Sequence, residues 1–358
     1  MSQARRLGAV LLLCLPGLGA APAPVLLPSG IADADGHVGY FASANDSIEA
    51  IDLASGKVLW QTHEAQRPLL VDGEHLLAQA GVKRNRLRIL RLDRTNGECD
   101  LESDSVVFPA WVVTGEAHGH SFSAHWRLGK HQLILDWEAS AWHVGKPTPQ
   151  EEEAARKHAS GVFAVDLRTG QIEVRPVEKT DAPPPPALPE HLENKPLRWQ
   201  GQVGPHRKVL VLEERNGQQH FVLHSWDPQK EKEQEAQELL RGKRLVVRVT
   251  LDERVLWLRE AGSSADEGNS LMPRKEPSWW QLFSVETGKR LGRVRDEAGM
   301  NTFVVLGKRV FYLVPGPMHG SLDRPNIQPR ILKAIDLSSG KKLWERPIAG
   351  KLLTPPPL

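Results

Sequence analysis

The chain carries the same short phrase near both of its ends. Residues 50–60 read AIDLASGKVLW and residues 334–344 read AIDLSSGKKLW, with nine of eleven positions identical. In each copy a short β-type run precedes an aspartate that can bond backbone N–H groups two residues on. A glycine then permits the left-handed conformation that closes a tight turn. The phrase therefore predicts a β-hairpin whose returning strand ends in tryptophan.

Degenerate copies of this hairpin sequence recur between the two ends of the chain. The copies at 90–101, 163–174 and 282–294 keep the turn glycine, and HSWDPQK at 224–230 keeps only its aspartate. Together the six copies predict the following turn and docking residues: Asp52, Gly56, Trp60, Asp93, Gly97, Asp166, Gly170, Gly288, Asp336, Gly340 and Trp344. Eleven Trp against two Tyr suits a fold that uses indole rings as filler between repeated units.

Each hairpin is preceded by further short runs rich in aromatic, leucine or β-branched residues, such as HVGYFAS at 37–43 and RVFYLVP at 309–315. One unit thus holds about four antiparallel strands in about 40 to 70 residues, as in the blade of a β-propeller. We expect an all-β propeller of four-stranded antiparallel blades, with six recognisable. Seven or eight blades stay open, because the third unit is long. In a closed ring the first and last units are neighbours.

Three stretches interrupt the pattern. Residues 146–160 suggest a short helix within the third unit. Residues 176–197 include a proline-rich run, which predicts an exposed polyproline loop between blades rather than a domain boundary. Residues 229–241 look helical by composition, although the repeat register places them on the fourth strand of the fourth blade. We expect residues 24–358 to form a single propeller with these insertions.

The N-terminus has the layout of a secretory signal peptide. Arg5 and Arg6 precede the apolar run 7–15, and small residues that permit cleavage follow, so residues 1–23 are the predicted signal. This run is too short to span a bilayer comfortably. The residues before Cys14 do not favour lipid anchoring. We therefore expect a periplasmic or secreted protein of bacterial type.

Signal cleavage changes the charge and the cysteine count. The formal net charge of +2 falls to zero with the loss of Arg5 and Arg6, which argues against a nucleic-acid partner because such binders need a basic face. Cleavage also removes Cys14 and leaves Cys99 alone, so no internal disulfide is expected.

The written-out unit DGHVGYFASANDSIEAIDLASGKVLW at 35–60 resembles the pyrroloquinoline-quinone-type propeller repeat, closely in the first and last units and partially in between. The resemblance implies that Trp60 and Trp344 pack between neighbouring blades. It is not specific for activity, because the family holds quinone-dependent dehydrogenases, non-enzymatic assembly scaffolds of the bacterial envelope and other exported proteins.

The features that the dehydrogenases of this family carry are not found here. The resemblance would imply an adjacent-cysteine disulfide beside the quinone, a calcium-binding Glu/Asn/Asp set and an aspartate base, and no segment matches them. DADG at 33–36 resembles the start of a calcium loop but lacks the later acidic ligands, so we interpret it as a surface turn. We therefore expect no catalytic residues and no bound cofactor.

Two further groups of residues admit a functional interpretation. His118, His120 and His125 have a spacing that can hold zinc or copper, but a convincing fourth ligand is missing. Trp279 and Trp280 could stack on a flat ligand, although in a strand their side chains point to opposite faces. Surface histidines and structural tryptophans are the simpler interpretations, and no metal site is predicted.

These observations favour an exported, non-catalytic propeller that acts as a binding or scaffolding module. Two alternatives stay open: a propeller that binds a quinone or a metal, and an envelope protein-assembly factor that binds peptides. The expected partners are proteins or peptides of the cell envelope, and the protein is expected to be monomeric.

Overall fold

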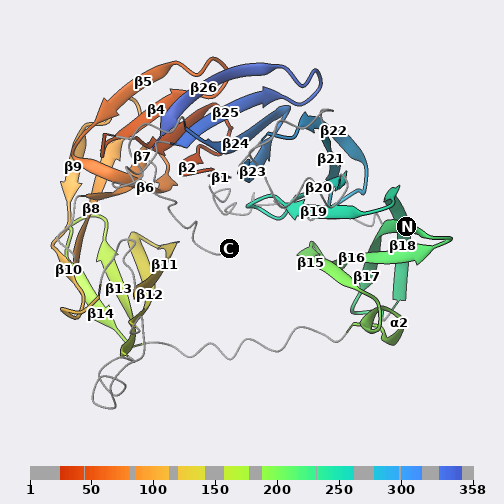
Figure 1. The fold of residues 1–358 in the computed structure, drawn as a ribbon. Helices are drawn as coiled ribbons and strands as arrows, with labels where there is room; N and C mark the ends of the chain where they lie inside the picture. The colour runs from red at the N-terminus through yellow and green to blue at the C-terminus, as the bar shows by residue number, and fades with distance from the viewer. Residues whose placement is uncertain are drawn as a thin grey trace, which may run out of the picture.

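The computed structural model describes residues 25–43, 45–80, 85–112, 120–141, 157–176, 188–230, 232–261, 278–297, 300–316 and 330–348. Strands that pair in antiparallel sheets make up 67% of them, and helix is almost absent from them. The predicted all-β fold is confirmed: six such sheets follow one another along the chain and are arranged like the blades of a propeller (Figure 1).

The first three sheets are built from consecutive strands. The first holds β1 (Val25–Leu27), β2 (Gly30–Ala32), β3 (Val38–Ala42), β4 (Ile48–Asp52) and β5 (Val58–Thr62). The second holds β6 (Ala65–Asp72), β7 (His75–Ala80), β8 (Arg86–Asp93), β9 (Cys99–Glu102) and the short β10 (Val106–Val107). The third holds β11 (His120–Gly129), β12 (Gln132–Ala141), β13 (Lys157–Asp166) and β14 (Ile172–Arg175).

The last three sheets have four strands each. The fourth holds β15 (Leu197–Val203), β16 (His206–Arg215), β17 (Gln218–Asp227) and β18 (Lys232–Gly242), and the short helix α2 (Glu190–Glu193) precedes it. The fifth holds β19 (Leu245–Val249), β20 (Val255–Glu260), β21 (Trp279–Ser284) and β22 (Arg290–Arg295). The sixth holds β23 (Asn301–Leu306), β24 (Arg309–Pro315), β25 (Arg330–Asp336) and β26 (Lys342–Ile348).

The burial of each strand follows its place in the blade. Middle strands such as β16 and β24 are buried on both faces, and their centres are continuous apolar runs: VLVL at 209–212 and VFYLV at 310–314. Outer strands such as β5 and β26 alternate between buried and exposed residues. A sheet with a neighbour on each side buries both faces of its central strands, which explains why these runs do not show simple alternation.

The structure bears on all three irregular stretches. The repeat register, which places 229–241 on the fourth strand of the fourth blade, is confirmed against their helical composition, because residues 232–242 form strand β18 and pair with β17 along its length. Residues 157–160, the end of the expected helix at 146–160, belong to strand β13, and residues 142–156 lie outside the described part. Within 176–197, the described end forms helix α2 and residues 177–187 lie outside the described part.

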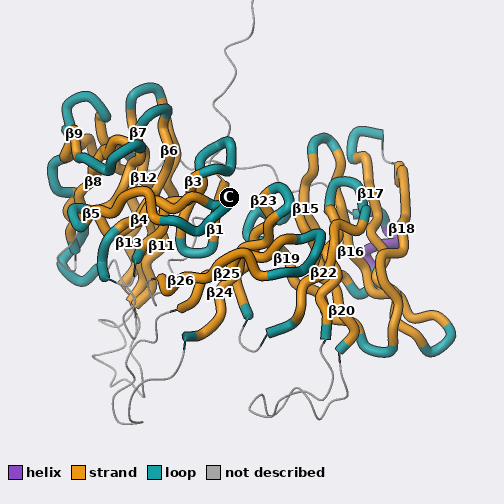
Figure 2. The backbone as a smooth tube through the Cα atoms, turned by 90° about the horizontal axis from the view of Figure 1, so that it is seen from above, coloured by secondary structure: helices purple, strands orange, loops and turns teal. Residues whose placement is uncertain are grey.

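Five of the six seams between neighbouring sheets are closed by apolar clusters. Each cluster draws buried residues from two adjacent sheets: sixth with first, first with second, second with third, fourth with fifth, and fifth with sixth. The third and fourth sheets instead hold separate small clusters, Ile134/Val162/Ala164 and Val209/Val211/Val222. These two sheets stand apart in both views (Figures 1 and 2). Within the described chain, neighbouring sheets of the expected ring therefore pack on each other at five seams, and the third and fourth sheets share no apolar cluster.

The first and last sheets lie side by side, although they are furthest apart in the sequence (Figure 1). Trp344 of β26 belongs to the same buried cluster as Phe41 and Ile51 of the first sheet. Arg346 of β26 also pairs with Glu49 of β4 at 3.3 Å. The two best-preserved copies of the repeated phrase therefore meet at one seam.

We expect Trp344→Ala to lower the free energy of unfolding by about 3 to 5 kcal/mol, because a buried indole at this seam would be replaced by a cavity. Its neighbour Leu343 provides the matched control, since it occupies the bulge between β25 and β26 and is 43% exposed. Leu343→Ala should change the stability by no more than about 0.5 kcal/mol. Urea unfolding measures both, and equal losses for the two variants would contradict the placement of Trp344.

Candidate functional site

The predicted turn glycines lie at five equivalent hairpins. In each, the glycine N–H donates to the carbonyl of the residue four positions earlier, as from Gly56 to Asp52 and from Gly340 to Asp336, both at 2.8 Å. All five have φ between +66° and +78°: Gly56, Gly97, Gly170, Gly288 and Gly340. In this left-handed region a Cβ is costly, which explains the choice of glycine.

The turn aspartates cap the same hairpins with their side chains. Asp52 Oδ1 accepts from the Ser55 N–H at 2.7 Å, and Asp93 Oδ1 accepts from the Thr95 N–H at 2.7 Å. Hydrogen bonds from the Arg168 side chain and backbone lower the pKa of Asp166 to about 2. Those from Ser338 and Ser339 lower the pKa of Asp336 to about 2. These half-buried carboxylates are thus engaged in holding the turns.

Both predicted docking tryptophans contact the turn of the next sheet. Trp60 Nε1 donates to the carbonyl of Arg94 at 2.8 Å, and Trp344 Nε1 donates to the carbonyl of Leu53 at 3.1 Å. A Cβ on Gly97 would lie 2.6 Å from the Trp60 ring, and one on Gly56 would lie 2.5 Å from the Trp344 ring. Glycine is therefore required twice, by its backbone conformation and by the indole that rests on it.

Other side chains take the place of tryptophan at two further seams. Arg91 Nη1 of β8 donates to the carbonyl of Leu167 at 2.6 Å, which is the carbonyl after the turn aspartate, as in the two tryptophan seams. Gln237 Nε2 donates to the Gly288 carbonyl at 3.3 Å between the fourth and fifth sheets. Sequence reasoning missed both residues, because neither occupies the tryptophan position of the repeated phrase.

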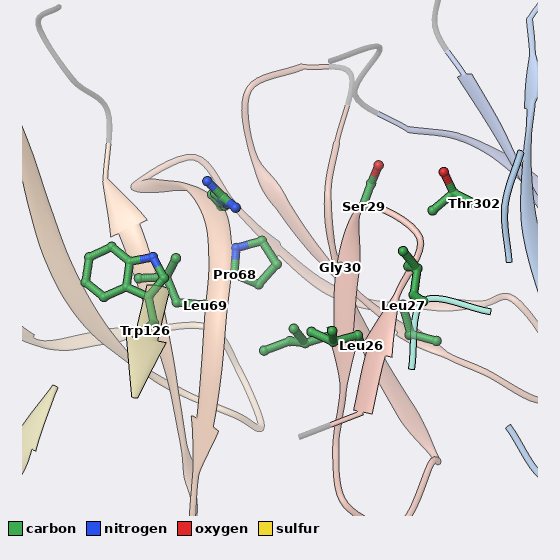
Figure 3. Close-up of a pocket in the computed structure, with 11 residues that line it drawn as sticks. Leu26, Leu27, Ser29, Gly30, Pro68, Leu69, Trp126 and Thr302 are labelled. Atoms are coloured by element: carbon green, nitrogen blue, oxygen red, sulfur yellow. The ribbon is translucent and has the colours of Figure 1, made fainter. Parts of the chain in front are cut away.

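A small cavity lies on the inner side of the sheets. It is lined by residues of the innermost strands β1, β2, β6, β11 and β23 and by a turn of the fifth sheet, and its volume is about 30 Å³. Leu26, Leu27, Pro68, Leu69 and Trp126 form its largely apolar walls, as Figure 3 shows. A volume of this size holds about one or two water molecules.

Two lining residues of this cavity have an unusual backbone. Ser29 has φ +61° and Thr302 has φ +51°, and the side chains of both lie at the same end of the cavity (Figure 3). The Ser29 hydroxyl is buried without a hydrogen-bond partner. Desolvation lowers the pKa of Arg67, the charged residue in the lining. A β-branched residue at positive φ is strained, and such strain often marks functional positions.

The described histidines of this group, His120 and His125, do not form a metal site with neighbouring side chains. His120 and His125 lie five residues apart on β11, and His118 lies outside the described residues. Among the described residues, no group of three or more His, Cys, Asp or Glu side chains is arranged to hold a metal ion. Cys99 is a free thiol.

The remaining candidates have structural surroundings. Asp33 of the DADG turn accepts from the His37 N–H at 2.8 Å and pairs with Arg94 of the second sheet at 3.3 Å. Trp280 is fully buried and donates to Asp296 at 2.8 Å, whereas Trp279 is half-buried beneath the Arg293 guanidinium. The two indoles therefore lie on opposite sides of β21.

A polar network on the fourth sheet was not foreseen from the sequence. It joins His191 and Lys195, which lie on and just after α2, to Glu213 of β16, His224 of β17 and Glu233 of β18. His224 is 4% exposed and its Nε2 has no hydrogen-bond partner. The network could not be found in the sequence, because it depends on the register between β16 and β17, in which Val209 pairs with His224.

No protein-family model matches the sequence, and it matches no curated protein. Solved structures with a similar arrangement include the Dos1 propeller, which is 11% identical with a TM-score of 0.25 over 88% of this chain and 69% of that one. A second is the quinohemoprotein alcohol dehydrogenase ADHIIG from Pseudomonas putida HK5, 13% identical with a TM-score of 0.26 over 88% and 58%. A third is a europium-containing methanol dehydrogenase, 11% identical with a TM-score of 0.33 over 91% and 77%.

These neighbours are propellers with and without enzymatic descriptions, and the chain spans 58 to 77% of their lengths. At such TM-scores, the blade architecture rests on the strand pairings of this chain itself. Within the described residues, no helix has the length and apolar character needed to cross a bilayer.

The hydrogen bonds at the turns predict how these carboxylates titrate. We expect NMR titration to place the Asp336 midpoint near pH 2, because Ser338 and Ser339 stabilise the ionised form. A folded pKa below the ordinary value means that the capping contribution is present above about pH 3.8 and is lost as the pH falls toward 2. In Ser338→Ala/Ser339→Ala the midpoint should rise toward 3.8. An unchanged midpoint in that variant would contradict the assignment.

Proposed function

We propose that this protein is an exported, non-catalytic β-propeller that acts as a binding or scaffolding module for protein or peptide segments of the cell envelope. The observation that carries this proposal is the seam between the third and fourth sheets, where the described residues share no apolar cluster. The third sheet therefore offers the face around Ile134, Val162 and Ala164 to a partner, while Leu188 packs on the corresponding face of the fourth sheet. At the edge of that face Leu197, which pairs with Val211, is 39% exposed.

The outer strand of the third sheet also suits recognition of an extended peptide through its edge; its Val174 is 73% exposed and lies opposite Phe163, on the side of the second sheet. Strand β14 pairs on one side with β13, and its other edge closes the order of the sheet. A peptide that adds a strand there would gain main-chain hydrogen bonds, with affinity supplemented by apolar contacts. Exposed apolar side chains that gather on one side of a molecule often mark an interaction surface.

The quinone-binding alternative keeps some support from the repeated phrase, which resembles the pyrroloquinoline-quinone-type propeller repeat, and from the enzymatic neighbours. The inner cavity does not supply a site for a quinone. Cofactor pockets usually measure about 300 to 1,000 Å³. The described walls of this cavity enclose about 30 Å³, so a flat multi-ring quinone there would require them to move apart, whereas the hollow lined by Arg295, Lys333 and Glu345 measures about 540 Å³.

The binding role predicts where a partner is captured. A photoreactive amino acid at Leu197, which pairs with Val211 on the open face of the fourth sheet, should cross-link to a segment of an envelope protein in intact cells, identified by mass spectrometry of the adduct. The same group at Leu59 is the matched control, because Leu59 is 51% exposed on the outer strand of the first sheet. Equal cross-linking at both positions, or none at Leu197, would contradict a binding surface at this seam.

The dehydrogenase alternative is tested separately. The full-length mature protein is incubated with pyrroloquinoline quinone and calcium, dialysed, and assayed for alcohol-dependent dye reduction. We expect no retained quinone and no turnover. Clear turnover would overturn the non-catalytic role, and retention without turnover would instead favour a quinone-binding propeller.

A further inference from the structure

The face of the fourth sheet that points away from the fifth sheet is covered by the segment that precedes β15 in the sequence. Strands β16 and β17 alternate their side chains, so Val209, Val211 and Val222 lie on the face opposite to the cluster shared with the fifth sheet. Leu188 packs against these three valines, and Leu192 of α2 is fully buried. We call residues 188–196 the strap. It covers the face that has no neighbouring sheet in the described structure.

The strap is fastened by few polar contacts. The Pro196 carbonyl accepts from the Leu212 N–H at 3.0 Å. Lys195 Nζ contacts Glu213 Oε1 at 2.6 Å, and His191 Nε2 contacts Glu233 Oε2 at 2.9 Å. A helix of four residues has little stability of its own, so these contacts and two leucines must hold the strap in place.

One carboxylate joins two imidazoles beneath the strap. Glu233 binds His191 of the strap through Oε2 and His224 of β17 through Oε1. The other ring nitrogen of His224, Nε2, is buried, has no hydrogen-bond partner and lies 4.0 Å from Glu213 Oε1. His224 therefore lies between two carboxylates, and one of its nitrogens is aimed at the second of them.

The other charged groups of this face are paired among themselves. Arg215 of β16 pairs with Glu213, and His220 of β17 contacts Glu238 of β18 at 2.9 Å. Arg207 of β16 donates to Gln200 of β15 at 2.8 Å. Glu190 on α2 is exposed. The groups that face His224 directly are thus the two carboxylates, with Lys195 and Arg215 behind Glu213.

Protonation of His191 and His224 would strengthen the contacts that hold the strap on the fourth sheet. A protonated His191 turns its hydrogen bond to Glu233 into an ion pair, and a protonated His224 directs a new N–H at Glu213. We propose that residues 188–196 form a pH-sensitive strap, docked on the fourth sheet most tightly when His191 and His224 are protonated. The strap loosens as the pH rises and uncovers the valine cluster at the open seam.

The carboxylates stay charged through the relevant range. Burial opposes ionisation of Glu233, but hydrogen bonds from His224 and His191 outweigh it and lower its pKa. Burial likewise opposes ionisation of Glu213, and Lys195 and Arg215 outweigh it and lower its pKa. A lowered folded pKa means that these groups support docking above their ordinary range and fail only in stronger acid. Docking is therefore strongest where both imidazoles are protonated and both carboxylates are still charged.

Hydrogen exchange tests the strap in the full-length mature protein. The reporters are the amides of Leu192, Lys195 and Leu212, which donate to carbonyls within or at the end of the strap. After correction for intrinsic exchange, their protection should be about three- to tenfold higher at pH 5.5 than at pH 8.0, because charged hydrogen bonds are stronger than neutral ones. His191→Gln should at least halve this response, and Glu233→Gln should abolish it.

A matched control separates the strap from general acid effects. His158 and Glu138 form a comparable contact at 3.8 Å on the exposed third sheet, so His158→Gln should leave the response unchanged. Equal protection at the two pH values in the parent protein would overturn the proposal, as would a full response in both His191→Gln and Glu233→Gln. Should Glu233→Gln fail to fold, the exposed His191→Gln decides alone. None of these outcomes depends on the binding partner, so the proposed function is tested independently.

Discussion

The contact between an indole and the glycine turn of the next sheet determines how neighbouring sheets are placed. Trp344 and Trp60 each donate to the carbonyl that follows a turn aspartate, and each ring covers a glycine with no room for a Cβ. The contact between indole and turn therefore fixes the end of the strand that carries the tryptophan, the turn of the next sheet and the seam between the two sheets. Because Trp344 reaches the turn at Gly56, the last sheet is held against the first.

Four of the five packed seams share a hydrogen bond to a turn carbonyl, although the donor residue differs. Arg91 supplies this bond between the second and third sheets, and Gln237 supplies a related one between the fourth and fifth sheets. A long donor that reaches a turn carbonyl, with apolar packing beside it, satisfies a backbone group that would otherwise be buried unpaired. Among the described residues the third and fourth sheets have no such contact, and the strap covers the face of the fourth sheet instead. The proposed binding and the proposed regulation both fall on this side of the molecule.

The sequence predicts the local part of this architecture well. An aspartate and a glycine four residues apart determine a hairpin through contacts within the turn itself, so copies such as Asp166/Gly170 could be recognised individually. The substitute donor Arg91 could not, because its acceptor is 76 residues away and its strand is not the outer one. The charged composition of β18 suggested a helix, but pairing with β17 overrides this propensity. The network around His224 depends on the register between strands and on the strap, and neither follows from residue types alone.

The most direct test of the docking contact is a double-mutant cycle between Gly56→Ala and Trp344→Ala, followed by urea unfolding. If the indole rests on the glycine, the alanine methyl is tolerated far better once the ring is gone. We expect a coupling of about 1 to 3 kcal/mol, with the double variant less unstable than the sum of the single losses. Additive losses within about 0.5 kcal/mol would show that the last sheet does not dock on the first through this contact.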